Sequence, residues 1–262
     1  MNQELTKITN GRNFRELGGY KTLDNRTIKT HKLLRSGHWA DLSHEDMEFL
    51  KEYGASTIVD FRSKAEVTKQ PDRVPDGVDY HFDPVFSEDL TKSSKDESEL
   101  LLASKDDGNY GIDHMLLAYD DMITADSSRA AYQDLFAKLL ANDQEKEALV
   151  FHCTAGKDRT GFGALLILSA LNLPLSTIKE DYLLTNTIIN DYVQSLLDKA
   201  KADGANENQL QTIKDIQSVR SEYFDHVVNT IQNEFGDVKN YLHQNLKLSN
   251  EDLDELRDLY LD

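Results

Sequence analysis

The stretch that decides the fold is Ala148-Leu149-Val150-Phe151-His152-Cys153-Thr154-Ala155-Gly156-Lys157-Asp158-Arg159-Thr160. Its first five residues are mostly apolar and predict a short buried strand that ends at His152. From Thr160 to Leu171 the chain is apolar on nearly all sides, which predicts a helix in the core. A strand that enters a helix through such a loop brings backbone N–H groups together at the helix start, where they bind anions.

Cys153 lies in this loop and is the single cysteine of the 262-residue chain. A lone cysteine is commonly a small buried apolar residue, so its neighbours must decide its role. A helix N-terminus and nearby cations lower the pKa of a thiol from about 8.5 to about 3.5–7.5. We therefore predict that Cys153 is a thiolate nucleophile.

The other loop residues have the chemistry that phosphate requires. Arg159, six residues after Cys153, can direct its planar guanidinium at two phosphate oxygens. The hydroxyl of Thr160 can donate to the sulfur, and His152 is expected to orient the loop because a thiolate needs no base. The predicted phosphate-binding residues are Thr154, Ala155, Gly156, Lys157, Arg159 and Thr160.

The leaving oxygen of a phosphate ester needs a proton, and three carboxyl groups are candidates for supplying it. Asp158 lies inside the loop, whereas Asp60 and Asp83 end predicted strands, and the carboxyl ends of strands share one crevice. Phosphate beside Asp158 would favour its protonated form and an acid role. We rank Asp158 first, Asp60 second and Asp83 third. For Asp60 an ion pair with Arg62 is an equally good interpretation as a role as proton donor.

The run His-Cys-x-Ala-Gly-Lys-Asp-Arg-Thr-Gly resembles the bacterial tyrosine/serine and phosphoinositide phosphatases. The resemblance covers most of the chain, except residues 87–108 and 194–211, and it implies a cysteine-phosphatase fold with a helical lid. Lys157 is similar to the lysine of the phosphoinositide phosphatases, whereas Thr154 departs from those with a second lysine there. The other segments that carry the resemblance are 13–20, 34–37, 60–63 with Glu66, 74–77, 181–186 and 219–223.

The rest of the chain predicts an α/β fold in which a central, mostly parallel sheet is flanked by helices. We expect one phosphatase domain over residues 1–262, with a helical C-terminal part and a helical lid at about residues 186–218. The polar stretch 87–108 predicts a mobile acidic insertion. The elements behind this prediction are strands at 56–60 and 78–82, helices capped by Ser43, Ser63 and Ser249, and helices at about 113–123 and 128–141.

Composition limits the partners of this protein. A net charge of −18 disfavours nucleic acid and anionic membranes, so a phosphate must be attracted by a local cluster of cations. The longest apolar run is too short to cross a bilayer, and the N-terminus does not resemble a signal peptide. We expect a cytoplasmic protein, with leaderless or processed secretion left open. No metal-ligand spacing or cofactor motif is evident, and the sequence defines no oligomeric state.

These features predict a cysteine-dependent phosphomonoester hydrolase that forms a cysteinyl-phosphate intermediate. Its expected partners are a phosphorylated protein, carrying phosphotyrosine or also phosphoserine and phosphothreonine, or a phosphoinositide. Two alternatives stay open: a sulfurtransferase, which also uses a cysteine in such a loop, and an inactive module that only binds phosphate.

Overall fold

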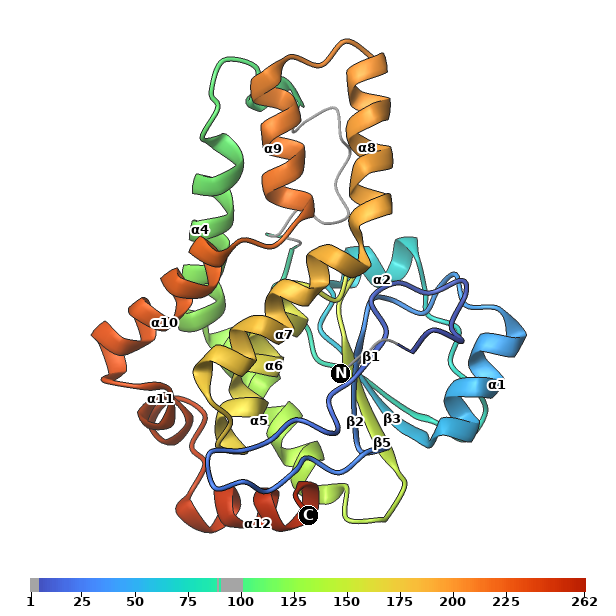
Figure 1. The fold of residues 1–262 in the computed structure, drawn as a ribbon, viewed down its shortest axis with the longest axis vertical. Coiled ribbons are helices and arrows are strands. Elements are labelled where there is room, and N and C mark those ends of the chain that lie inside the picture. Colours follow the sequence, from blue (N-terminus) through green and yellow to red (C-terminus); the bar gives the residue numbers. More distant parts are fainter. Residues whose placement is uncertain (1–4, 89, 91–100) are drawn as a thin grey trace.

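A five-stranded sheet with helices on both faces forms the centre of the computed structural model, which describes residues 5–88, 90 and 101–262 (Figure 1). The strands are Arg15–Glu16 (β1), Leu33–Ser36 (β2), Ala55–Asp60 (β3), Asp79–Phe82 (β4) and Ala148–His152 (β5). The helices are His44–Tyr53 (α1), Lys64–Lys69 (α2), Tyr110–Thr124 (α4), Asp126–Ala141 (α5), Arg159–Ala170 (α6), Leu175–Ile188 (α7), Asn190–Ala202 (α8), Glu207–Gln217 (α9), Ser221–Phe235 (α10), Val238–Gln244 (α11) and Asn250–Tyr260 (α12).

The order of the sheet is β1-β2-β5-β3-β4, and only β1 runs antiparallel to its neighbour. The last residues of β2, β5 and β3 lie in register, because His152 pairs with Ser36 on one side and with Asp60 on the other. The predicted mostly parallel α/β sheet is therefore confirmed. Its carboxyl edge presents Cys153, which follows β5 directly.

The apolar residues of β5 explain why this strand lies at the centre. Leu149 and Phe151 pack into the larger core, together with the apolar side chains of α4 to α7 and α10. Ala148 and Val150 face the opposite way, into a smaller core that includes Trp39 and side chains of α1. Successive strand residues point to opposite faces, so a strand covered on both sides has to be apolar throughout.

Helix starts agree with the serines that the sequence analysis selected. Ser43, Ser63 and Ser249 each cap a helix through a reciprocal hydrogen-bonded pair with the residue three positions on. The partner of Ser63 in this pair is Glu66, which also contacts Thr154 in the loop that follows β5.

Helices α8 and α9 extend away from the sheet, and α9 packs against the upper part of α4 (Figure 1). The predicted insertion at 87–108 is described only in part. Residues 89 and 91–100 are outside the described part, but the carbonyls of Leu101 and Lys105 accept hydrogen bonds from Gln209 and Asn206 at the start of α9. Ser104 is fully buried. The described end of this stretch therefore packs against α9 and is not a fully exposed loop.

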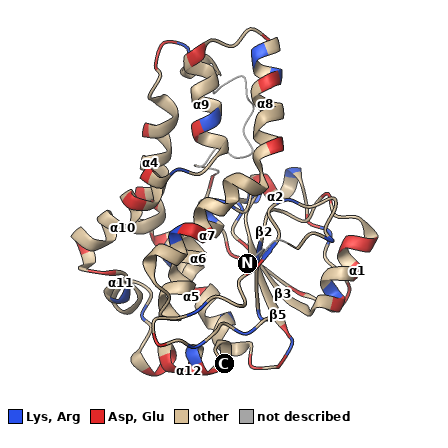
Figure 2. Ribbon diagram, in the orientation of Figure 1, with Lys and Arg blue, Asp and Glu red and all other residues tan. Residues whose placement is uncertain are grey.

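Charge is distributed unevenly between the centre and the outside of the molecule. Acidic and basic residues both occur on the outer helices, and further basic residues lie near the centre of the molecule (Figure 2). Lys157 and four arginines are almost fully buried: Arg15, Arg35, Arg62 and Arg159. Each of these buried cations is paired with at least one buried carboxylate. Among the described residues no helix is long and apolar enough to cross a membrane.

Candidate active site

The loop between β5 and α6 begins at Cys153, whose side chain is 1% exposed. The loop turns at Gly156, which has a φ of +68° in the left-handed region that L side chains rarely adopt. A Cβ on Gly156 would also lie 2.4 Å from the carbonyl oxygen of Ser36. Glycine is therefore required for the loop to pass this close to the end of β2.

Side chains outside the loop bind its carbonyl groups. Asn13 donates to the carbonyl oxygens of Ala155 (3.2 Å) and Gly156 (2.8 Å), and Arg35 donates to that of Gly156 (2.9 Å). The C=O and N–H of a trans peptide point in opposite directions. The N–H groups of Gly156 and Lys157 consequently face away from these donors, as a phosphate-binding loop requires.

Arg159 is held in a fixed plane by Glu66. Its two terminal nitrogens donate to the two carboxylate oxygens of Glu66, each at 2.8 Å. Glu66 also accepts hydrogen bonds from the hydroxyl of Thr154 and from the backbone and side chain of Ser63. Two parallel N–H···O bonds restrict both the position and the orientation of a guanidinium. The loop arginine is thus positioned by the helix cap of α2.

The pKa of Glu66 reflects these contacts. Burial raises the pKa of this carboxyl, but the charge and hydrogen bonds of Arg159 outweigh it and hold the pKa at about 2. In the sequence Glu66 belongs to the family resemblance, but nothing there connects it with Arg159. No local pattern shows that a residue 93 positions earlier in the chain meets the loop arginine.

Asp158 and Lys157 contact each other at the helix start. The ammonium of Lys157 lies 2.5 Å from one oxygen of Asp158 and 2.6 Å from the carbonyl oxygen of Ile216 at the end of α9. The hydroxyl of Tyr119 donates to the other oxygen of Asp158 at 2.8 Å. In this arrangement Lys157 is fully buried and connects the loop to α9. Its role in phosphate binding stays a prediction.

Asp60, the second candidate acid, takes part in a buried ion pair. Arg62 donates to both of its oxygens at 2.7–3.0 Å, and the hydroxyl of Tyr80 donates at 2.7 Å. Burial raises the pKa of Asp60, but His152, Arg62 and the hydrogen bonds bring it down to about 2. These contacts stabilise the carboxylate and favour the ion-pair interpretation over proton donation.

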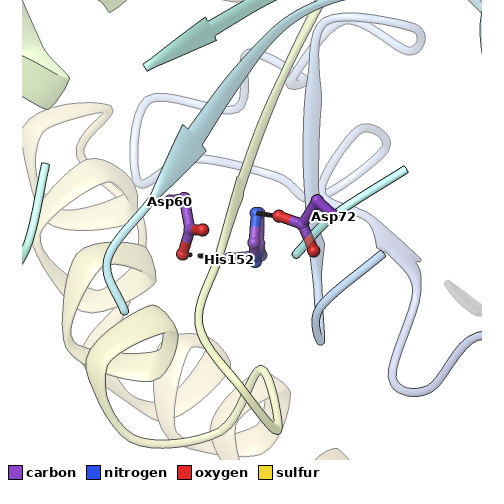
Figure 3. A group of neighbouring side chains, drawn as sticks. All are labelled: Asp60, Asp72 and His152. Carbon is purple, nitrogen blue, oxygen red and sulfur yellow. Dashed lines mark ion pairs between the residues drawn. The ribbon is translucent and has the colours of Figure 1, made fainter. Parts of the chain in front are cut away.

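Figure 3 shows His152 between Asp60 and Asp72. Its Nε2 lies 3.1 Å from Asp72 Oδ2 and its Nδ1 lies 3.8 Å from Asp60 Oδ1. Burial lowers the pKa of His152, but the two carboxylates outweigh it and the net effect is a raised pKa. The three side chains are close enough to hold a metal ion. A guanidinium nitrogen of Arg62 lies 2.7 Å from both carboxylates, so a cation already occupies this position.

Two other predicted residues have simpler surroundings. Asp83, the third candidate acid, forms an ion pair of 3.0 Å with Lys138 on α5. The hydroxyl oxygen of Thr160 is buried and has no hydrogen-bond partner within the described ranges. Donation from Thr160 to the sulfur of Cys153 stays a prediction.

Two N-terminal arginines, Arg15 and Arg35, bind α7. Arg35 donates to the carboxylate of Asp181 at 2.6 Å, and Arg15 donates to the carbonyl of Asp181 at 2.8 Å and to the hydroxyl of Thr185 at 3.2 Å. Burial raises the pKa of Asp181, but the two guanidinium groups outweigh it, so the pKa is lowered. The pair formed by Arg35 and Asp181 therefore fixes α7 against the loop.

Taken together, the parallel sheet and the loop between β5 and α6 define the cysteine-phosphatase fold. The chain belongs to the tyrosine phosphatase family and is a phosphatase, because the model of that family matches residues 6–262. A putative tyrosine-protein phosphatase of Cupriavidus necator is 32% identical over 250 residues, which cover 95% of this chain and 85% of that protein. The triple specificity protein phosphatase PtpB of Mycobacterium tuberculosis is 27% identical over 255 residues, which cover 88% of this chain and 90% of that protein.

Proposed function

We propose that this phosphatase hydrolyses phosphomonoesters through a cysteinyl-phosphate intermediate, with phosphotyrosine as the first substrate to test. The observation that carries the proposal is the geometry of the loop around Cys153. Its carbonyls are bound from outside by Asn13 and Arg35, and Arg159 is held by both oxygens of Glu66. Such a loop presents N–H groups and a guanidinium to an anion without reorganisation, which is how charge on a transferred phosphoryl group is stabilised.

In the first step the thiolate of Cys153 attacks phosphorus, an S–P bond forms, and the bond from phosphorus to the ester oxygen breaks. The leaving oxygen takes a proton from Asp158, so an alcohol or phenol departs and Asp158 becomes a carboxylate. What supports this assignment is that Asp158 lies within the loop, directly before α6. All three candidates are paired with a cation, Asp60 with Arg62, Asp83 with Lys138 and Asp158 with Lys157, so the position of Asp158 within the loop decides the choice.

In the second step a water molecule attacks the phosphorus of the cysteinyl-phosphate. The carboxylate of Asp158 takes a proton from this water, the S–P bond breaks, and the electron pair returns to the sulfur of Cys153. Inorganic phosphate leaves, and both residues regain their initial protonation states. The hydroxyl of Thr160, buried and without a partner in the described part of the chain, can donate to the sulfur as it departs.

Phosphotyrosine is the first choice because the family and the two relatives carry tyrosine phosphatase or multiple specificity in their names. Phosphoserine, phosphothreonine and phosphoinositides are proposed as further substrates. Lys157, the residue that most favoured a lipid substrate in the sequence, is engaged by Asp158 and Ile216. A phosphoinositide would therefore have to displace one of these contacts in order to use it.

We also propose that α8 and α9 act as the helical lid, at about residues 186–218. Arg12, in the segment before β1, stacks on the ring of Tyr192 in α8 at 4.3 Å. Lys157 in the loop donates to the carbonyl of Ile216 in α9. These two contacts hold both lid helices against the catalytic half of the chain, where Cys153 is 1% exposed.

The test is a phosphate-release panel that compares the wild type with Cys153→Ser. We expect release from phosphotyrosine peptide, with phosphoserine peptide and a phosphoinositide ranking the other classes. Cys153→Ser should lose more than about 1,000-fold in kcat, because the serine hydroxyl is not ionised at neutral pH. Release that survives in Cys153→Ser would contradict the mechanism.

Two further measurements distinguish the alternatives. Turnover of thiosulfate by the wild type, without phosphate release, would indicate a sulfurtransferase. Binding of phosphotyrosine peptide without release from any substrate would indicate an inactive phosphate-binding module.

A further inference from the structure

A buried chain of polar groups leads from α4 and α7 to the loop residue Asp158. The hydroxyl of Tyr119, on α4, lies 2.8 Å from Oδ1 of Asp158. The hydroxyl of Tyr182, on α7, lies 2.7 Å from that of Tyr119. The exposed fractions are 1% for Asp158, 2% for Tyr119 and 4% for Tyr182. Water therefore does not compete for these hydrogen bonds.

The direction of these hydrogen bonds follows from the carboxylate. An ionised carboxylate only accepts, so the proton of Tyr119 points to Asp158. The oxygen of Tyr119 is then left to accept, and the proton of Tyr182 points to Tyr119. Each oxygen of Asp158 has its own donor, because Oδ2 is contacted by Lys157. A carboxylate oxygen can accept twice, so a position stays open on each for the proton that is transferred.

We propose that Tyr119 is the positioning residue of the proton donor: it fixes the carboxyl of Asp158 toward the leaving oxygen, and Tyr182 fixes Tyr119. The proposal rests on the proposed function, in which Asp158 protonates the leaving group. As the proton departs, Asp158 gains charge, and the hydrogen bond from Tyr119 becomes a charge-assisted one. Bonds of this kind are about twice as strong as neutral ones. The contribution of Tyr119 is therefore greater in the transition state than in the ground state.

The packing of Tyr119 is consistent with a fixed position. Its ring lies 5.7 Å from that of Tyr223 on α10, and α4 packs against both α9 and α10. Moving the ring of Tyr119 away from Asp158 would disturb its contact with Tyr223. Tyr119 lies 39 residues before Asp158, so only the tertiary fold brings the two together.

The first experiment uses Tyr119→Phe, which removes the hydroxyl and keeps the ring. Phenyl phosphate has a strongly basic leaving group and needs the acid, whereas p-nitrophenyl phosphate has a weakly basic one and needs it little. We expect kcat to fall about tenfold for phenyl phosphate, the size of one lost charge-assisted hydrogen bond, and much less for p-nitrophenyl phosphate. Removing a donor to the carboxylate favours its neutral form, so the basic limb of the kcat pH profile should move to higher pH.

Tyr241→Phe is the matched control. Its hydroxyl is also buried and also bonds to α4, at the carbonyl of Ile123 (3.0 Å), but it has no contact with Asp158. We expect a similar change in melting temperature for both variants and a change in leaving-group dependence only for Tyr119→Phe. Tyr182→Phe keeps Tyr119 in place and should give a smaller change of the same sign. This variant tests the proposal even if Tyr119→Phe folds poorly.

The outcome that overturns the proposal is an equal loss of kcat on both substrates with an unchanged basic limb, because a structural defect acts on all substrates alike. Asp158→Asn separates this failure from a failure of the proposed function. If Asp158→Asn retains the leaving-group dependence of the wild type, the acid assignment is wrong. If Asp158→Asn makes kcat more dependent on the leaving group, the assignment holds, and adding Tyr119→Phe should produce no further change because the two residues act through one proton transfer.

Discussion

At the scale of single residues, Glu66 connects a structural element to the chemistry. Its carboxylate caps α2 through Ser63 and holds the guanidinium of Arg159 with two hydrogen bonds of 2.8 Å. A buried arginine without a carboxylate would carry an uncompensated charge, which is costly. The cap of a short helix thus sets the position of the group expected to bind phosphate.

Glu66→Gln tests this connection. The amide of glutamine has one accepting oxygen and one donating nitrogen, so it cannot accept the two parallel hydrogen bonds from Arg159, and the guanidinium loses its fixed plane. We expect kcat to fall by at least about tenfold and the free energy of unfolding to fall by about 1–3 kcal/mol. Kinetics on phosphotyrosine peptide and chemical denaturation measure the two effects.

Asp46→Asn is the control for Glu66→Gln. Asp46 has the same place in the capping box of α1, is buried, and has no contact with the catalytic loop among the described residues. This variant should lose stability and keep its kcat. Equal losses of kcat in both variants would show that Glu66 acts only through stability.

At the scale of elements, the sheet and the lid position the site in different ways. The last residues of β2, β5 and β3 lie in register, which gives the loop a fixed base. Arg12 contacts Tyr192 of α8 through a cation–π pair, Lys157 donates to the carbonyl of Ile216 in α9, and α9 also packs against α4. A cation–π contact contributes about 0.5–1 kcal/mol at exposed sites.

Tyr192→Ala should make Cys153 more accessible. Removing the ring on which Arg12 stacks weakens the closed arrangement by about 0.5–1 kcal/mol, so the rate of alkylation by iodoacetamide should rise about two- to fivefold. Gln194→Ala is the control, because Gln194 is exposed on the same helix and bonds to Asp198 within α8. An unchanged alkylation rate in Tyr192→Ala would contradict the lid proposal.

At the scale of the whole molecule, buried charges make stability depend on pH. Asp60, Asp72, Arg62 and His152 form one buried network behind the loop, and Glu66 pairs with Arg159 beside it. The pKa values of Glu66 and Asp60 are held at about 2, below their ordinary values of 4.5 and 3.8. A carboxyl whose pKa is lowered by folding stabilises the fold while it is ionised.

The free energy of unfolding should therefore fall as the pH drops from about 4.5 to about 2, where Glu66 and Asp60 take up protons in the folded state. His152 acts in the opposite direction. Its pKa is raised above 6.5, so its contribution is complete below that pH and is lost as the pH rises through the folded pKa. Melting temperatures measured from pH 2 to pH 9 test both the loss of stability at acidic pH and the loss that His152 causes as the pH rises.

Asp60→Asn should lower the free energy of unfolding at neutral pH. It should also reduce the further loss of stability on acidification, because one of the two carboxylates no longer titrates. The exposed variant Glu48→Gln should keep the acid limb of the wild type. An acid limb of unchanged slope in Asp60→Asn would contradict the role of this network.

The sequence by itself determined the local parts of this protein. The apolar run before His152 predicted β5 with its correct ends, and the serines at positions 43, 63 and 249 marked three helix starts, because these signals depend on neighbours within a few residues. The loop from Cys153 to Thr160 carried the chemistry of the family. The alternation of strands and helices predicted the mostly parallel sheet.

Only the tertiary structure decided which distant groups complete the site. Glu66 meets Arg159, Tyr119 meets Asp158, and Lys157 meets the end of α9 through contacts between residues 39 to 93 positions apart. Whether Asp60 faces a substrate or a cation likewise depended on Arg62, Tyr80 and His152 around it. Such hydrogen bonds and ion pairs form where packed elements bring side chains together, and no pattern along the chain specifies that arrangement.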